Sequence, residues 1–207
     1  MTNITKLPSG IMAIGPAHSV EFWSAVNPDE GSCVTADYPR EMNYGPTANF
    51  VAGQLVACGE NRCDVYVAGQ WVFLVTTLAE RRYHSSVVRG DRILLIGGVP
   101  TGDSTGDVGT TEWISLDGSS PETGPFKTRH GGLQCTIQVS SDVIIMLSGW
   151  GSGGKVTEYR LDVPNEGTPL TDRLDDQTRN AACGVYQNVA GQQVKLLQNC
   201  HGTLTKI

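Results

Sequence analysis

Residues 82–114 decide the fold, and they read RYHSSVVRGDRILLIGGVPTGDSTGDVGTTEWI. A first segment (85–88) is joined to an apolar second segment (93–96) by a short turn containing Gly90 and Asp91, as in a β-hairpin. The second segment ends in Gly97 and Gly98, and a loop then leads to a third segment that carries an acid and an aromatic residue. Segments of this length, separated by turn residues, predict antiparallel strands.

The same pattern recurs along the chain, which predicts an array of four-stranded antiparallel units. In each unit a short turn joins a first strand to an apolar strand that ends in small residues. An acid-bearing strand follows, and an outer strand comes last. The first strands are at 48–51, 85–88, 135–139 and 183–186. The apolar strands are at 11–15, 55–59, 93–98, 143–149 and 194–198. The acid-bearing strands are at 20–23, 63–66, 111–114 and 157–159.

Composition supports an all-β chain. Glycine accounts for 25 of 207 residues, about 12% against a usual ~7%, and charged residues are only 17%. The net charge of −6 and the lack of a basic run argue against a nucleic-acid partner.

No apolar run approaches the ~18 residues of a membrane-spanning helix. Since residues 1–10 do not look like a signal peptide, we expect a cytoplasmic protein. The extracellular alternative would suit paired cysteines and the sequon at Asn3.

The unit at 82–114 resembles the kelch repeat, through its double glycine after an apolar run and its acid–aromatic strand. The resemblance covers about residues 10–197 and implies blades of a β-propeller. Only Gly97-Gly98 is a true double glycine, since other units have Cys58-Gly59, Ser148-Gly149 and Gln198-Asn199. We expect a single kelch-repeat domain over 1–207, with units near 10–45, 46–80, 81–128, 129–178 and a partial unit at 179–207. The strand count, three, then twelve in full units, then two, favours an incomplete ring over a closed four-bladed one.

Recurring residues at strand ends are expected to hold the units together. Gly97, Gly98 and Gly149 would let an apolar strand end against a neighbouring backbone without a clash. The recurring acids would be partly buried structural carboxylates that accept hydrogen bonds from backbone amides or arginines, in preference to a ring of metal ligands. These acids are Glu21, Asp64, Glu112 and Glu158. We expect no metal and no cofactor.

A candidate partner-binding face follows from the topology of a four-stranded meander. The segments that enter each unit and the loops after each apolar strand open on the same side, and loops on a rigid scaffold commonly carry recognition. A purely structural role, pairing with the acids, is the alternative for the arginines. The candidate residues are Arg81, Arg82, His84, Arg129, His130, Arg179, and Asp103 and Trp150 in the two loops.

Six cysteines allow up to three disulfides, and a bridge between Cys58 and Cys63 across one hairpin is geometrically reasonable. Cys135 and Cys183 fall at similar positions of successive units and are expected to be small buried residues. No G-x-S-x-G, H-E-x-x-H, P-loop or Rossmann motif is present, so we expect no enzyme.

The kelch resemblance implies a protein-interaction scaffold, with self-association through open blade edges as a further expectation. One alternative is a copper-dependent enzyme, since the galactose oxidase group has kelch-like blades. That chemistry would need Tyr, His and Cys to converge, and the four histidines show no common ligand spacing. Another alternative is the substrate-recognition part of a ubiquitin-ligase adaptor. It would need a separate recruiting domain, for which no helical segment is seen.

Overall fold

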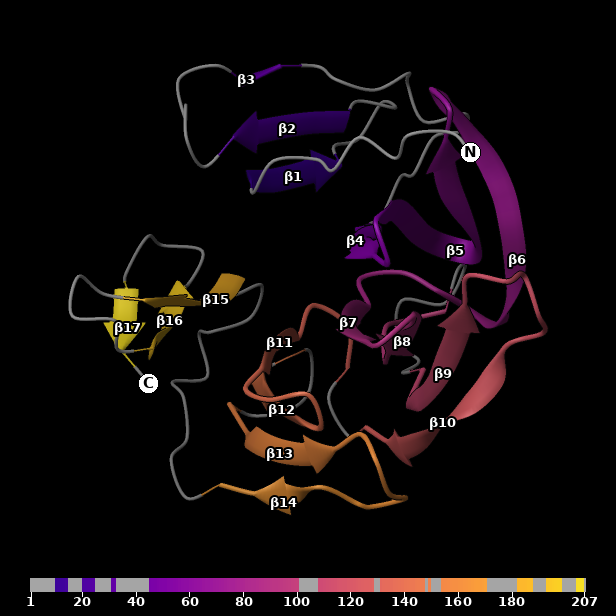
Figure 1. Cartoon of the computed structure of the whole chain (residues 1–207). Coiled ribbons are helices and arrows are strands. Elements are labelled where there is room, and N and C mark those ends of the chain that lie inside the picture. Colours follow the sequence, from indigo (N-terminus) through magenta and orange to yellow (C-terminus); the bar gives the residue numbers. More distant parts are fainter. Residues whose placement is uncertain are drawn as a thin grey trace.

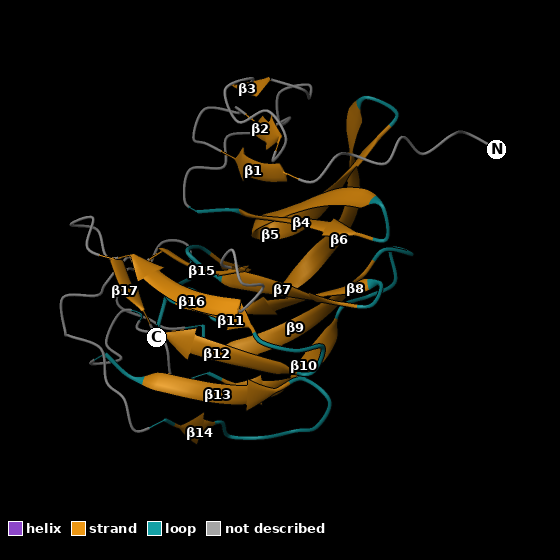
Figure 2. Cartoon of the chain, turned by 60° about the vertical axis from the view of Figure 1, so that its left-hand side comes forward, coloured by secondary structure: helices purple, strands orange, loops and turns teal. Residues whose placement is uncertain are grey.

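The structure is a computed structural model, and it describes residues 45–100, 108–128, 131–147, 149 and 154–170 in full. It also describes the backbone of the strands at 10–14, 20–24, 31–32, 182–187, 193–198 and 204–206. Every regular element in these ranges is a β-strand, and none is a helix, as Figure 2 shows. The prediction of an all-β chain built from antiparallel strands is therefore confirmed.

Seventeen described strands form five sheets, and each sheet uses strands that are consecutive in the chain. The first sheet contains β1 (Gly10–Ile14), β2 (Val20–Ser24) and β3 (Gly31–Ser32). The second contains β4 (Thr47–Val51), β5 (Gln54–Val67) and β6 (Gln70–Arg81). The third contains β7 (Ser85–Arg89), β8 (Arg92–Ile96), β9 (Thr110–Ser115) and β10 (Glu122–Lys127). The fourth contains β11 (Cys135–Gln138), β12 (Val143–Leu147), β13 (Val156–Arg160) and β14 (Thr168–Pro169). The fifth contains β15 (Ala182–Gln187), β16 (Gln193–Gln198) and β17 (Leu204–Lys206).

The predicted strand distribution is wrong in two places. The last unit was predicted to have two strands, but β17 pairs with β16 and makes a third. The second unit was predicted to have four, but its middle pair is one continuous strand, β5. This strand folds back on itself near Glu60, because the Cα atoms of Cys58 and Cys63 are only 4.1 Å apart. Five extended residues would span roughly 16 Å.

Successive sheets meet through their first strands. Contacts join β1 to β4, β4 to β7, β7 to β11 and β11 to β15. In Figure 1 these five strands lie toward the middle of the picture, and the last strand of each sheet lies toward the periphery. The sheets thus follow one another in chain order, each with its first strand against that of the next sheet.

Strand β8 shows why the apolar runs lack polar alternation. Its four apolar residues, from Ile93 to Ile96, are all fully buried. Ile93 and Leu95 belong to the core shared with the second sheet, whereas Leu94 and Ile96 belong to the core shared with the fourth. Since successive side chains point to opposite faces, a strand between two sheets needs apolar residues at every position.

The backbone repeats from unit to unit at two positions where φ is positive. One lies two residues before the start of a first strand, at Gly45, Tyr83 and Leu133, with φ of 55°, 52° and 65°. The other lies two residues after the end of the apolar strand at Gly98 and Gly149, where φ is 106° and 107°. Both positions border the end of the sheets where loops from neighbouring units meet.

Candidate interaction face

Loops from two kinds of segment meet at one end of the described sheets. Arg82 and Val99 exchange two backbone hydrogen bonds of 2.8 and 2.9 Å, which tie the segment entering the third sheet to the loop after β8. The Leu133 amide donates to the Tyr83 carbonyl at 2.9 Å, which adds the segment entering the fourth sheet. We call residues 81–84, 97–99 and 131–134 the loop face. The same-side placement expected from the meander topology is present here.

Gly98 and Gly149 allow backbone segments of neighbouring loops to lie close together in the loop face. A Cβ on Gly98 would lie 2.7 Å from the Arg82 carbonyl oxygen and 3.1 Å from the His84 Cβ. A Cβ on Gly149 would lie 2.9 Å from the Gly131 carbonyl oxygen. Real Cβ atoms do not approach backbone oxygens this closely, and both glycines also have a φ that side chains disfavour. Both units therefore close their loops by the same device.

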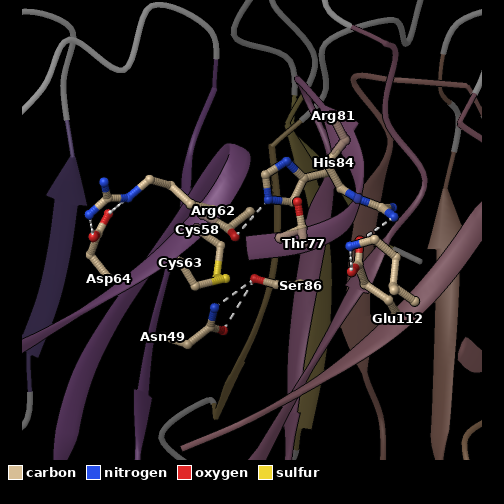
Figure 3. Close-up of a disulfide and its surroundings, with 12 residues drawn as sticks. Asn49, Cys58, Arg62, Cys63, Asp64, Thr77, Arg81, His84, Ser86 and Glu112 are labelled. Atoms are coloured by element: carbon tan, nitrogen blue, oxygen red, sulfur yellow. Dashed lines mark hydrogen bonds and ion pairs between the residues drawn. A yellow bond between two sulfur atoms is a disulfide. The ribbon is translucent and has the colours of Figure 1, made fainter. Parts of the chain in front are cut away.

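Arg81 and Glu112 form a buried ion pair beneath the loop face. Their closest N–O distance is 2.5 Å, and each side chain is about 1% exposed. Arg81 Nη1 also donates to the carbonyls of Gly97 and Thr110, and the Leu78 amide donates to Glu112 Oε2 at 2.6 Å. Burial lowers the pKa of Arg81, while Glu112 opposes that shift. The pair joins the end of β6 to β9 (Figure 3) and is structural.

His84 is only 6% exposed and lies close enough to Arg81 to feel its positive charge. Its Nε2 is 3.0 Å from the Thr47 hydroxyl, while Nδ1 has no hydrogen-bond partner among the described residues. Burial, and secondly the positive charge of Arg81, lower the pKa of His84 to about 3. The imidazole is therefore neutral at pH 7 and acts as a polar link between the first strands of two sheets.

The partner-binding interpretation must be corrected for two of the predicted residues. Arg81 and His84 are buried, and both form hydrogen bonds within the protein, so neither presents its polar group to a partner. Arg82 is half-buried and, with Tyr83, is the part of this segment that reaches the surface. The remaining predicted residues lie outside the described ones, and they are Asp103, Arg129, His130, Trp150 and Arg179.

The four predicted carboxylates are not equivalent. Glu112 lies opposite Leu95, and the matching position in the fourth sheet, opposite Met146, is occupied by Thr157. Glu158 is one residue further on, and a one-residue step turns a side chain to the other face of the strand. It is half-buried, and it does not take the place of Glu112 in the repeat.

Asp64 and Glu21 are the other two predicted carboxylates, and of these two the structure describes the side chain of Asp64 only. Asp64 is fully buried, and it accepts a 3.0 Å hydrogen bond from Arg62 Nε. It therefore fits the expected role. Glu21 lies opposite Ala13, and its side chain is outside the described residues.

The fourth sheet has no carboxylate at the position of Glu112, because Thr157 is there. The Gly149 position meets the Gly131 carbonyl oxygen as the Gly98 position meets the Arg82 carbonyl oxygen, so Gly131 matches Arg82. The residue that would match Arg81 lies outside the described ones.

Polar contacts between first strands were missed by the sequence reasoning. Asn49 on β4 and Ser86 on β7 share hydrogen bonds of 2.8 and 3.2 Å, and the Ser85 and Thr136 hydroxyls are 2.6 Å apart. Gln134, which is buried, donates to the Ile96 carbonyl at 2.7 Å. Hydroxyl and amide residues near the start of each first strand were the available signal. These bonds align one sheet against the next.

The disulfide expected between Cys58 and Cys63 is present, with both residues fully buried (Figure 3). It closes the fold in β5, and it takes the position that Ile96 and Thr111 occupy in the third sheet. Cys135 is also disulfide-bonded, with a partner outside the described residues. The expectation that Cys135 is a small buried residue is therefore wrong, since it is half-buried and disulfide-bonded.

An open groove of about 740 Å³ runs between β10 and residues 164–166. In the described part of the chain, no three His, Cys, Asp or Glu side chains cluster closely enough to bind a metal ion. Those same residues contain no helix with the length and apolarity needed to cross a membrane.

The fold and the loop face define an all-β protein made of repeated antiparallel sheets. No protein-family model matches the sequence, and no similar curated protein is found. Among solved structures, the chain is similar to one described as the structure of YjhT, with a TM-score of 0.69 at 14% sequence identity. The similarity covers 93% of this chain and 72% of that one. At this identity it shows a shared fold and nothing of activity.

Proposed function

We propose that the protein is a kelch-type β-propeller scaffold that binds another protein through the loop face. The sheets would be the blades, and the contacts between successive first strands are what such blades require. The loop face carries the proposal, because two kinds of loop are fastened there to a rigid base by backbone hydrogen bonds. Rigid scaffolds with surface loops are the usual setting for recognition.

Arg82 is the residue through which we propose that a partner is contacted. Its backbone is fixed by the two bonds to Val99, while its side chain is half-buried at the edge of the face. Guanidinium groups bind carboxylates strongly and are enriched in protein interfaces. The buried Arg81–Glu112 pair beneath it supplies a fixed base, so a partner would meet a surface that is already organised.

Site-specific photocrosslinking tests this function. A photoreactive residue would replace Arg82 in the full chain, and, as a control, Arg160, which is exposed on β13 away from the loop face. We expect position 82 to give a discrete protein adduct that excess unlabelled protein competes away, and position 160 to give none. Equal labelling at both positions, or no competable adduct at position 82, would contradict the proposal.

We also propose that the protein matures in an oxidising compartment, which is the extracellular alternative to the cytoplasmic expectation. Support comes from the two cysteine sites in disulfides, Cys58–Cys63 and Cys135. Stable disulfides are typical of secreted proteins and rare in the cytosol. Thiol labelling of the protein in its native source checks this, since free Cys58 and Cys63 would contradict it.

A further inference from the structure

Two large side chains of the loop face are held in a backbone conformation that glycine normally adopts. Tyr83 has φ of 52° and Leu133 has φ of 65°, and at the same position of the second unit Gly45 has φ of 55°. In this left-handed region the Cβ atom of an L-residue lies too close to the following carbonyl oxygen. Because Gly45 shows that glycine fits here, the larger residues of the third and fourth units are retained at a cost to stability.

The other left-handed side chains of the described chain lie where the chain reverses its direction. Ala52 and Ala68 are each the first residue of a two-residue hairpin turn that Gly53 or Gly69 completes. Such turns require positive φ at both positions. Glu60, the remaining one, lies where β5 folds back on itself. A tyrosine and a leucine at a position that accepts glycine call for another reason, and strain of this kind is concentrated where proteins bind ligands.

The loop face presents few side chains at its surface. Residues 81–84, 97–99 and 131–134 are all buried except Arg82, Tyr83 and Leu133, which are half-buried. The Leu133 amide donates to the Tyr83 carbonyl at 2.9 Å, so these two residues are neighbours. A partner that meets this face therefore meets one guanidinium, one phenol ring and one aliphatic side chain. The two strained residues are two of these three.

The Tyr83 side chain is fixed close to the backbone. A Cβ on Gly45 would lie 3.0 Å from Tyr83 Cδ1, and a Cβ on Gly132 would lie 3.3 Å from Tyr83 Cβ. The side chain thus fits between the segments that enter the second and the fourth sheets. A side chain held in place before binding loses little conformational freedom in a complex. Tyrosine and arginine are also enriched among the residues that dominate binding energy in protein interfaces.

The charges of the loop face indicate which chemical group it accepts. Arg81 is paired with Glu112, and His84 is neutral at pH 7, so Arg82 is the remaining charged side chain of the face. A guanidinium binds a carboxylate with charge-assisted hydrogen bonds. Tyr83 and Leu133 lie beside Arg82 and offer apolar surface instead of further charge. The complementary group is therefore a carboxylate next to a large apolar side chain.

We propose that the loop face binds a protein segment with Asp or Glu next to a large apolar residue, whose apolar side chain packs against Tyr83 and Leu133 while its carboxylate pairs with Arg82. This inference rests on the proposed function and names the chemistry of the partner. Packing within the protein is the alternative reason for Tyr83, and it predicts that removal of the ring destabilises the fold. Recognition predicts that glycine, as at position 45, leaves the fold intact and removes binding.

Peptide selection followed by calorimetry tests the inference. Random short peptides displayed on phage are selected on the intact protein, and one selected peptide is compared with a copy in which alanine replaces its apolar residue. We expect the selected peptides to share an acid next to a large apolar residue. Tyr83→Gly and the alanine peptide should each weaken binding at least about tenfold, and both together hardly more, because each removes the same contact. Leu133→Gly should behave like Tyr83→Gly.

Urea unfolding separates recognition from packing. The midpoint of Tyr83→Gly should be no lower than that of the wild type, because the left-handed strain is relieved. Ala68→Gly is the matched control, since it relieves the same kind of strain in a turn outside the loop face. It should bind the selected peptide as the wild type does.

Several outcomes would overturn the inference. They are a lower midpoint for Tyr83→Gly, no selected peptide, selected peptides without the acid–apolar pair, or additive losses when both partners are changed. A peptide that depends on Arg82, as Arg82→Gln would show, but is indifferent to Tyr83→Gly would leave the proposed function standing while this inference fails. Absence of a competable photocrosslink at position 82 would remove the proposed function itself.

Discussion

His84 shows how a single buried side chain makes stability depend on pH. Its folded pKa of about 3 lies below the ordinary value of 6.5, so the unfolded chain binds a proton more readily than the folded one between these values. The contribution of the neutral imidazole is fully present above pH 6.5. It is lost as the pH falls from 6.5 toward 3.

We therefore predict that His84→Gln weakens the dependence of stability on pH. Glutamine is a suitable replacement because Gln134 holds the equivalent place before β11. Between pH 6 and 4, the slope of the unfolding free energy should fall by about 1.4 kcal/mol per pH unit, which corresponds to one proton. Urea unfolding at several pH values measures it. Equal slopes in both proteins would contradict the assigned pKa shift.

Gly98 combines a φ that other residues disfavour with a close backbone contact. The effects of these two features on the unfolding free energy can be measured separately. We predict that Gly98→Ala destabilises the protein by about 2–4 kcal/mol, from left-handed strain together with overpacking against the Arg82 carbonyl. Gly69→Ala is the control, because Gly69 has φ of 87° but nothing within 4 Å of its Cβ position. It should cost about 1–2 kcal/mol. Thermal and urea unfolding compare the two, and equal losses would show that the contact is unimportant.

Among the strands, the connection between β6 and β9 depends on a buried charge pair. Glu112→Gln would leave the Arg81 guanidinium buried beside a neutral amide, so we predict a loss of about 3–5 kcal/mol in the unfolding free energy. Glu158→Gln, on the half-exposed face of β13, should change stability by no more than about 0.5 kcal/mol. Urea unfolding of both variants measures the difference. Similar small effects would mean that Arg81 finds adequate partners in the carbonyls alone.

Individual strands could be predicted from the sequence where a continuous run of apolar residues marks them. The continuous apolar run of β8 indicated a strand covered on both faces, and its side chains do pack into two cores. Register could not be predicted, because Thr-Glu-aromatic at 111–113 and 157–159 look alike yet are offset by one residue. The offset depends on loop geometry between the strands, which sequence similarity does not report.

At the scale of the whole molecule, the repeat predicted the order and number of sheets. The five sheets fall close to the five expected units, although β6 runs one residue past its expected end and β17 was missed. The candidate face was predicted in outline from the meander topology. The sequence did not predict which arginine or histidine reaches solvent. The burial of these side chains depends on the neighbouring sheet, and the residues of one unit do not reveal where that sheet lies.

The buried pairing of Arg81, at the end of β6, with Glu112, on β9, limits how such units can be recombined. A unit transplanted with only one of the two residues would carry an orphaned charge into an interior that has no counterpart for it. The two positions are 31 residues apart in the third unit, and they belong to segments on opposite sides of β7 and β8. Exchange of units by duplication or by engineering is thus tolerated only when the crossover points keep both positions within one inherited block.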